Sequence, residues 1–357
     1  MSALPAEEHA PGSVLLGEIR EQPAALERLL EHSDEYAAVA AVARERGLNL
    51  VRMVGHGSSD NAASYGVYAF GLLPRWTALR DSISLSVYYG AETDLKGSCI
   101  IALSQSGETP DVLAYVERAR ARGALTIAIT NDTDSALGEA AELVLPLAAG
   151  EERSIAATKT YTTQVAALAL LAAHAAGQGQ LIDEGIRAVA AQLDEALPAL
   201  ERRLAEIALA LAYIGRMFVI GRGPEFATAR EISLKLLETC RVAAEPLTAT
   251  DLIHGPLAAL DGMFPVWTIG SDDESLPAVR EAAARARAAG ATLVASGPAA
   301  REIADAGFYA AVPTPAVTLL SPLLSVVPGQ LLAWALAQAK GLDPDRPTGL
   351  SKITHAL

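Results

Sequence analysis

One pattern of residues occurs twice in this chain of 357 residues. An apolar run at 50–54 ends in Gly55-His56-Gly57, and a helical pattern follows it. A second apolar run, at 217–220, ends in Gly221-Arg222-Gly223 and is also followed by a helical pattern. Gly221 follows Gly55 by 166 positions, and Gly223 follows Gly57 by the same number. We therefore expect a duplicated unit in which a buried strand turns through glycines into a helix.

The segments around Gly123 and Gly290 repeat the duplication at an offset of 167 positions. Parallel strands need a crossover element between them, and alternating strands and helices place helices on both faces of a sheet. We predict an α/β fold of two tandem doubly wound parallel-sheet domains, each with three α/β/α layers. Ligands then bind beyond the carboxyl ends of the strands.

The expected elements divide the chain into four parts. Strands are expected at 50–54, 84–88, 99–103, 125–130 and 143–147 in the first copy, and at 217–220, 242–244, 264–270, 292–296 and 308–312 in the second. An alanine-rich stretch at 158–210 predicts long helices that join the copies without a flexible linker. We expect an N-terminal helical segment at 1–34, a first domain at 35–195, a second domain at 196–342 and a C-terminal tail at 343–357.

The formal net charge of −14 argues against nucleic acid and anionic membranes as partners, because both need a basic face. No uninterrupted apolar stretch approaches the roughly 20 residues of a membrane span. The first eight residues lack the basic and apolar regions of a signal sequence. We therefore expect a soluble, cytoplasmic protein.

Neither a cofactor nor a metal is expected from the sequence. Cys99 and Cys240 fall in a predicted strand and a predicted helix, which is typical of buried, reduced thiols. The two Gly-x-Gly turns lack the third glycine and the acidic residue of a dinucleotide-binding fingerprint. The six histidines are scattered, and no Cys/His cluster has the spacing of metal ligands.

A hydroxyl-rich turn separates the apolar run at 99–103 from a helical pattern that begins at Pro110. Its residues are Ser104-Gln105-Ser106-Gly107-Glu108-Thr109. Such a turn aims free backbone N–H groups and the positive end of a helix dipole at one point, as a phosphate requires. Helix capping is the alternative, since Ser and Thr also cap helices. Gln105 between two serines favours phosphate binding, because a cap needs fewer polar side chains.

Candidate catalytic residues lie in the second copy. Lys235 and Glu238 are three apart on the helix after Gly223, and Glu231 joins their face one turn earlier. An exposed ion-pair ladder is one interpretation of this pattern. The leucines around Lys235 favour instead a cleft wall at which an acid or base is tuned. His254 precedes a Gly-Pro turn that would hold its backbone stiffly.

Together these motifs resemble the sugar isomerase (SIS) family, and within it the isomerase half of the glucosamine-6-phosphate synthases. The matching motifs span nearly the whole chain: Glu18-Ile19-Arg20-Glu21-Gln22-Pro23, Gly57-Ser58-Ser59, Ser104-Gln105-Ser106-Gly107-Glu108-Thr109, Ala157-Thr158-Lys159-Thr160, Gly221-Arg222-Gly223, Leu234-Lys235-Leu236-Leu237-Glu238, His254-Gly255-Pro256-Leu257 and Lys352. The resemblance implies tandem SIS domains of flavodoxin-like fold that form a pseudo-symmetric pair.

The resemblance also implies a role for each candidate residue. The phosphate and sugar contacts would be Ser59, Ser104, Gln105, Ser106 and Thr109. Glu238 would transfer a proton between C1 and C2 of the sugar, with Lys235 as an assisting charge. His254, supplied by a neighbouring subunit, would open the sugar ring, and Lys352 would form a Schiff base or lie beside the carbonyl. The implied partners are a sugar phosphate and further copies of the chain, in a homodimer or a tetramer.

Two departures from the family pattern shape the functional prediction. No cysteine follows Met1, so we expect no glutaminase domain and no hydrolysis of glutamine. Ile253 stands where the synthases carry a lysine before the histidine. We therefore expect an enzyme that converts glucosamine 6-phosphate to fructose 6-phosphate and ammonia. An aldose–ketose isomerase, a fructosamine-6-phosphate deglycase and a non-catalytic sugar-phosphate sensor stay open as alternatives.

Overall fold

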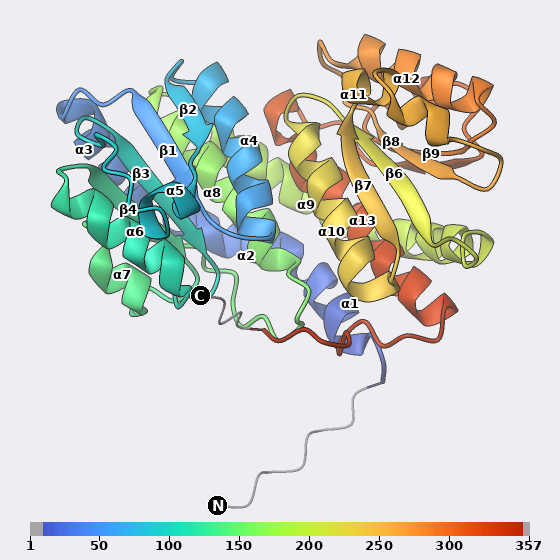
Figure 1. Cartoon of the computed structure of the whole chain (residues 1–357), viewed down its shortest axis with the longest axis horizontal. Coiled ribbons are helices and arrows are strands. Elements are labelled where there is room, and N and C mark those ends of the chain that lie inside the picture. The colour runs from blue at the N-terminus through green and yellow to red at the C-terminus, as the bar shows by residue number, and fades with distance from the viewer. Residues whose placement is uncertain (1–9, 353–357) are drawn as a thin grey trace, which may run out of the picture.

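Two parallel sheets lie side by side in the computed structural model, which describes residues 10–352 (Figure 1). The first sheet has the strand order β2-β1-β3-β4-β5. Its strands are β1 (Leu50–Val54), β2 (Thr77–Arg80), β3 (Cys99–Ser104), β4 (Leu125–Thr130) and β5 (Leu143–Pro146). All of their pairings are parallel.

The second sheet repeats this plan. Its strands are β6 (Arg216–Gly221), β7 (Ala243–Thr248), β8 (Pro265–Ile269), β9 (Thr292–Gly297) and β10 (Phe308–Ala311). Their order is β7-β6-β8-β9-β10, so in both sheets the first strand of the copy lies between the second and the third. In such a doubly wound sheet the connections diverge at that point and leave a crevice for ligands. The predicted fold class and the predicted duplication are confirmed.

One expected strand is wrong. Residues 84–88 belong mainly to a short helix, α5 (Ile83–Val87), and the second strand of the first sheet is β2. The hydroxyl of Ser82 accepts a hydrogen bond from Leu85 N–H at 3.3 Å, which caps the helix. β2 is an edge strand with half-exposed residues, so it lacks the apolar run that marks the central strands.

Helices surround the two sheets and fill the space between them (Figure 1). They are α1 (Ser13–Arg20), α2 (Gln22–Leu30), α3 (Ser33–Glu45), α4 (Ser58–Leu72), α6 (Pro110–Ala121), α7 (Ala136–Ala140), α8 (Lys159–Ala175), α9 (Gly179–Ala210), α10 (Glu225–Cys240), α11 (Ala249–Ile253), α12 (Leu276–Ala288) and α13 (Ser321–Ala339), with short 3-10 turns at Pro256–Ala259, Ala300–Glu302 and Thr318–Leu320. The long helices predicted at 158–210 are α8 and α9. The boundary expected between residues 195 and 196 lies inside α9, so the division into four parts stays a prediction.

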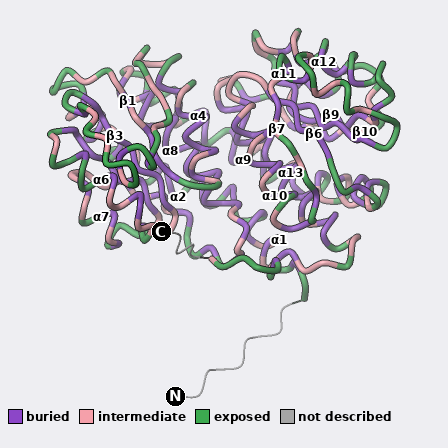
Figure 2. The backbone as a smooth tube through the Cα atoms, in the orientation of Figure 1, coloured by how far each residue is buried: buried purple, intermediate pink, exposed green. Residues whose placement is uncertain are grey.

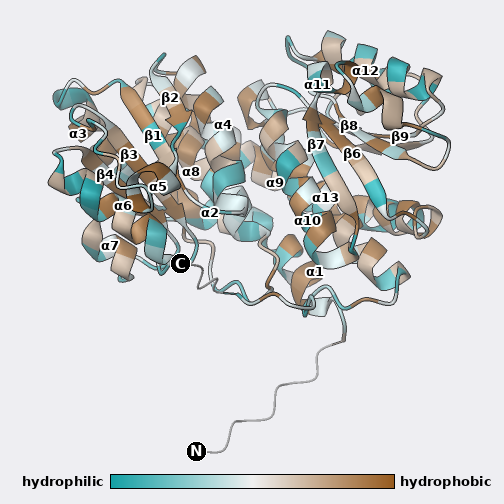
Figure 3. Cartoon of the chain, viewed as in Figure 1, coloured by the Kyte–Doolittle hydropathy of each residue, from teal (hydrophilic) through white to brown (hydrophobic). Residues whose placement is uncertain are grey.

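The largest hydrophobic cluster runs through both halves of the chain. Every residue of α8 except His174 is buried, and α9, α10 and α13 add apolar side chains to the same cluster. Figure 2 shows the buried segments gathered in the sheets and in the helices between them. Figure 3 shows many apolar residues along the same elements. The halves therefore share a core.

One core helix is strongly apolar. The segment Thr318–Ala339 is long and apolar enough to cross a membrane by length and composition. Serine, proline and glutamine interrupt its apolar residues, which hides this length in the sequence. In the fold 89% of its apolar window is buried, as in a core helix. Cys99 and Cys240 are buried and unpaired, as predicted.

The C-terminal tail returns from the second half of the chain to the first (Figure 1). Asp345 in the tail accepts hydrogen bonds from Val14 N–H at 3.1 Å and Leu15 N–H at 2.8 Å, in the first turn of α1. These bonds satisfy two free N–H groups of that helix. Of the predicted terminal segments, residues 1–9 and 353–357 lie outside the described residues.

Candidate active site

The serine turn, residues 104–109, follows β3 at the carboxyl edge of the first sheet. Ser104 Oγ accepts a hydrogen bond from Gly107 N–H at 3.1 Å and lies 3.3 Å from Thr109 Oγ1. Gly107 has a φ of 68°, and a Cβ at this position would lie 1.9 Å from Ser135 Oγ, so only glycine fits. Thr109 precedes α6 but makes no side-chain cap. Its hydroxyl is therefore not used by the helix, which argues against capping as the purpose of the turn.

The turn after β1 lies against the serine turn, because β1 pairs directly with β3. A Cβ on Gly55 would lie 2.9 Å from the Leu103 carbonyl oxygen, so the turn after β1 touches the end of β3, directly before the serine turn. Ser59 accepts a hydrogen bond from Gln164 Nε2 at 2.9 Å, which leaves its own hydroxyl proton for a ligand. Gln105 and Ser106 are half-buried in the same region. The fold thus brings all five predicted phosphate and sugar contacts to one edge of one sheet.

Lys235 joins the two halves of the chain. Its ammonium lies 2.6 Å from the Glu238 carboxylate, 3.4 Å from the Glu231 carboxylate and 3.3 Å from Ser58 Oγ. Ser58, at the start of α4, donates to Glu231 at 2.9 Å, and Asn61 donates to the same carboxylate at 2.8 Å. Lys235 and Glu231 are fully buried. The alternative of an exposed ion-pair ladder is therefore wrong.

Burial and charge oppose each other in this cluster. Burial by itself lowers the pKa of Lys235, but the carboxylates of Glu231 and Glu238 outweigh it and raise the pKa. Burial raises the pKa of Glu231, against the opposing effects of Lys235 and Asn61. One ammonium thus stays charged between two carboxylates. Glu238 is the carboxylate that a substrate can reach, since 21% of its side chain is exposed and none of the Glu231 side chain is.

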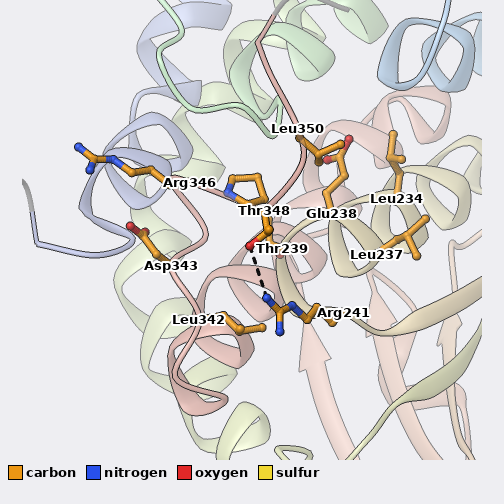
Figure 4. Close-up of a pocket in the computed structure, with 11 residues that line it drawn as sticks. Leu234, Leu237, Glu238, Thr239, Arg241, Leu342, Asp343, Arg346, Thr348 and Leu350 are labelled. Atoms are coloured by element: carbon orange, nitrogen blue, oxygen red, sulfur yellow. Dashed lines mark hydrogen bonds between the residues drawn. The ribbon is translucent and has the colours of Figure 1, made fainter.

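Glu238 lines a cavity of about 350 Å³ between α10 and the C-terminal tail (Figure 4). Leu234 and Leu237 contribute to the α10 side, and tail residues that include Thr348 and Leu350 form the opposite side. Arg241, at the end of α10, donates to Thr348 Oγ1 at 3.4 Å. The tail therefore forms one wall of the space into which the candidate catalytic carboxylate opens.

Lys352 reaches a second buried carboxylate. Its ammonium lies 3.0 Å from Glu152 Oε2 and also donates to the Ser154 carbonyl at 2.5 Å. Glu152 accepts a further bond from the Thr160 hydroxyl at 2.6 Å. Burial raises the pKa of Glu152, but Lys352 and the hydrogen-bond donors outweigh it and lower the pKa. The charge of Glu152 also acts on Lys235, so the two lysine–carboxylate clusters are neighbours.

His254 is not joined to this cluster within the chain. It lies at the end of α11 and is exposed. Its imidazole has no hydrogen bond or ion pair with any residue in the range 10–352. The structure thus joins Lys235 and Glu238 to Ser58 in the turn after β1 and joins Lys352 to Glu152, and it leaves His254 on the surface of the second half.

In the second copy, a side chain of the protein itself, Glu225, occupies the position that corresponds to the candidate phosphate site. Glu225 opens α10 and stands 166 positions after Ser59. Its carboxylate accepts hydrogen bonds from three buried hydroxyls, those of Ser271 at 2.6 Å, Ser325 at 2.8 Å and Thr228 at 2.6 Å. Burial raises the pKa of Glu225. The turn at 270–275, which matches the serine turn, also carries three acidic residues. These negative charges disfavour an anion at this place in the second copy.

The sequence did not reveal the groups that hold the catalytic candidates in place, namely Ser58, Asn61 and Glu152. Ser58 and Asn61 flank Ser59, but nothing in their spacing indicates that α4 packs against α10. Glu152 lies in an irregular loop, and its only signal is its closeness to the Thr158-Lys159-Thr160 motif. These residues meet their partners only in the folded chain.

The fold and the site define an SIS protein. The SIS domain family matches residues 49–174 and 210–338, one match for each sheet. The chain therefore belongs to the SIS domain family. The predicted resemblance is confirmed.

Relatives lie among sugar-phosphate enzymes. The chain is 35% identical over 361 residues to glutamine–fructose-6-phosphate aminotransferase (isomerizing) of Symbiobacterium thermophilum, an alignment that covers 95% of this chain and 58% of that protein. It thus spans little more than half of that relative's length. The C-terminal domain of glucosamine-fructose-6-phosphate aminotransferase from Francisella tularensis has a TM-score of 0.86 and 25% identity, with 97% and 100% of the two chains covered. A candidate phosphosugar isomerase from Silicibacter pomeroyi has a TM-score of 0.81 and 32% identity, with 94% and 100% covered.

Proposed function

We propose that this chain is a sugar-phosphate isomerase that deaminates glucosamine 6-phosphate to fructose 6-phosphate and ammonia. The contact between Lys235 and Ser58 carries the proposal, because it joins the Glu238 carboxylate of one half to the turn beside the serine turn of the other. A ligand held by its phosphate at the serine turn would extend its reacting carbons toward Glu238. Anchoring the distant phosphate in this way aligns C1 and C2 without any reaction at phosphorus.

Glu238 carries the proton transfer of this reaction. It takes the proton from C2 of the open-chain amino aldehyde while the C1 oxygen gains a proton, which gives an enolamine, and it then returns its proton to C1 while the amine nitrogen loses one. The product has a C=N double bond at C2. Water adds to C2, ammonia leaves, and the ketone of fructose 6-phosphate forms. Lys235 holds the carboxylate in position throughout, at 2.6 Å.

Two further groups complete the proposed site. Lys352 is the cation that would stabilise the oxygen at C1 as charge develops, or form a Schiff base with the carbonyl. His254 would open the sugar ring, because an imidazole can move a proton near neutral pH. Since His254 is exposed and unbonded among the described residues, we propose a homodimer in which it serves the site of the second copy.

Aldose–ketose isomerisation is the main alternative, because it uses the same proton transfer without loss of ammonia. A deglycase would act on a fructosamine 6-phosphate through the same carboxylate. The test offers the purified protein glucosamine 6-phosphate, ketose 6-phosphates and fructosamine 6-phosphates, and follows ammonia and ketose together. Equal release of ammonia and fructose 6-phosphate from glucosamine 6-phosphate is expected. Rapid turnover of another sugar phosphate without ammonia from glucosamine 6-phosphate would reject the deaminase.

A non-catalytic sugar-phosphate sensor would bind a ligand in the same place without turning it over. Two lysines and two carboxylates buried or half-buried beside the ligand site argue for chemistry instead, since binding alone does not need them. We retain the predicted cytoplasmic location, without nucleic-acid or membrane partners, as part of this proposal, on the net charge of −14.

A further inference from the structure

The turn after β1 carries a histidine that the proposed function does not use. His56 Nε2 lies 2.8 Å from Asp111 Oδ2, in the first turn of α6. The His56 side chain is 56% exposed, whereas the Asp111 side chain is only 10% exposed. Because β1 adjoins β3, the His56 side chain reaches from the turn after β1 to the first turn of α6, the helix that the serine turn precedes.

Asp111 places a negative charge where the phosphate is proposed to bind. It is the second residue of α6, directly after Thr109 and Pro110. Its Oδ1 is buried and has no hydrogen-bond partner within residues 10–352, and its Oδ2 also receives a longer bond from the Tyr88 hydroxyl at 3.4 Å. A carboxylate at a helix N-terminus stabilises the helix but repels an anion at the same place. Phosphate binding there requires a hydrogen-bond donor between the phosphate and the Asp111 carboxylate.

We propose that His56 is a phosphate-contacting residue, which Asp111 holds in place and whose imidazole separates the phosphate from the Asp111 carboxylate. The inference rests on the proposed function, because it assigns a specificity determinant to the same site. A carboxylate only accepts, so Nε2–H donates to Asp111 and Nδ1 is left without a partner in the described chain. A phosphate oxygen within hydrogen-bond distance of Nδ1 would give this nitrogen a partner, and the contact would select phosphorylated over unphosphorylated sugars.

Asp111 then holds His56 in place, which favours phosphate binding, and also repels the phosphate by its charge. A double-mutant cycle can separate these two effects. His56→Ala removes the donor and also exposes the phosphate to the Asp111 carboxylate. Asp111→Asn in that background removes the repulsion and restores part of the affinity. If Asp111 only supported the fold of the turn, the double variant would bind phosphate no better than His56→Ala.

The test measures inorganic phosphate binding by calorimetry, and KM and kcat for glucosamine 6-phosphate. We expect His56→Ala to weaken phosphate binding and to raise KM by about tenfold or more, with kcat changed by less than about threefold. The double variant recovers part of the loss. The matched control is His32→Ala, because His32 forms the same kind of pair with Glu35 at 2.8 Å, at the start of α3. Circular dichroism verifies that each variant is folded.

Unchanged phosphate affinity in folded His56→Ala overturns the inference, and so does a double variant that binds no better than His56→Ala. The proposed function fails separately if wild-type protein binds phosphate in a His56-dependent way but turns over no sugar phosphate. If the wild-type protein binds neither inorganic phosphate nor glucosamine 6-phosphate, both fall together.

Discussion

The ammonium of Lys235 lies 2.6 Å from the Glu238 carboxylate, one turn along the same helix. It also lies 3.3 Å from Ser58 Oγ, which belongs to the other half of the chain and precedes it by 177 positions. α10 of the second copy is thereby held against the start of α4 in the first. Together with the bonds that Ser58 and Asn61 donate to Glu231, this contact fixes α10, which carries the candidate catalytic carboxylate, against the turn after β1.

Glu238→Gln tests the proton transfer. The amide keeps the shape of the carboxylate but cannot take a proton, so we expect turnover to fall by about 10²- to 10⁴-fold with ligand affinity retained. The measurement is kcat together with calorimetric binding of the sugar phosphate. Glu245→Gln, an exposed position on β7, is the control and should leave both unchanged. If the wild-type protein binds sugar phosphates without any turnover, and Glu238→Gln binds them equally well, the sensor is the better reading.

Lys235→Met tests the buried charge cluster. The change leaves Glu231 and Glu238 without their counter-ion, so we expect the free energy of unfolding to fall by about 3–5 kcal/mol. Adding Glu231→Gln should restore part of this loss, because one buried charge disappears with it. Urea denaturation of the single and double variants gives both values. Simple additivity of two destabilising changes would show that the ammonium and Glu231 are not coupled.

Gly107→Ala tests the serine turn. Left-handed backbone costs a non-glycine residue about 1–2 kcal/mol. The added Cβ would also lie 1.9 Å from Ser135 Oγ. Gly123→Ala is a matched control, since Gly123 has a φ of 80° but nothing within 4 Å of the new Cβ. We expect Gly107→Ala to be the less stable variant by about 1–3 kcal/mol and to lose ligand binding, whereas Gly123→Ala keeps it. Equal thermal stability and equal binding of the two variants would contradict the close packing of this turn.

Glu18→Gln tests a pH dependence of stability. Burial, and then the nearby Glu152, raise the pKa of Glu18 from 4.5 to about 7, although the N–H groups of Arg153 and Ser154 oppose the shift. Between pH 4.5 and about pH 7, Glu18 keeps its proton in the folded state but has lost it in the unfolded state. Stability therefore falls as pH rises through this window, by at most about 3 kcal/mol from this group.

The measurement compares thermal unfolding of wild type and Glu18→Gln at pH 5 and pH 8. The variant should lose less stability than wild type between these values, because the amide does not titrate. Glu27→Gln, at an exposed position of α2, should behave as wild type. Identical slopes for wild type and Glu18→Gln would refute the shift.

The duplication and the central strands could be predicted because their signals are local. Buried parallel strands such as Cys99–Ser104 are continuous apolar runs, and each ends in a recognisable turn. The edge strand Thr77–Arg80 has no such run, so the apolar pattern of the sequence predicts a strand at 84–88, where the chain forms a short helix. The serine turn was found for the same reason as the central strands, since its side chains and its glycine are consecutive.

Contacts between distant residues could not be predicted, because no local pattern encodes them. Lys352 meets Glu152, and His56 meets Asp111, only where the tail and the neighbouring turns pack together. The exposure of His254 is likewise a property of the packed second half.

By itself the sequence determined the α/β class, the duplication and the identity of the hydroxyl-rich turn, since periodicity and turn chemistry act over a few residues. The tertiary structure decided which carboxylates are buried and which one lines a cavity. The physical reason is burial: packing α10 on α4 forces Lys235 to find its partners inside the protein, and Glu225 fills the second copy's pocket with its own negative charge.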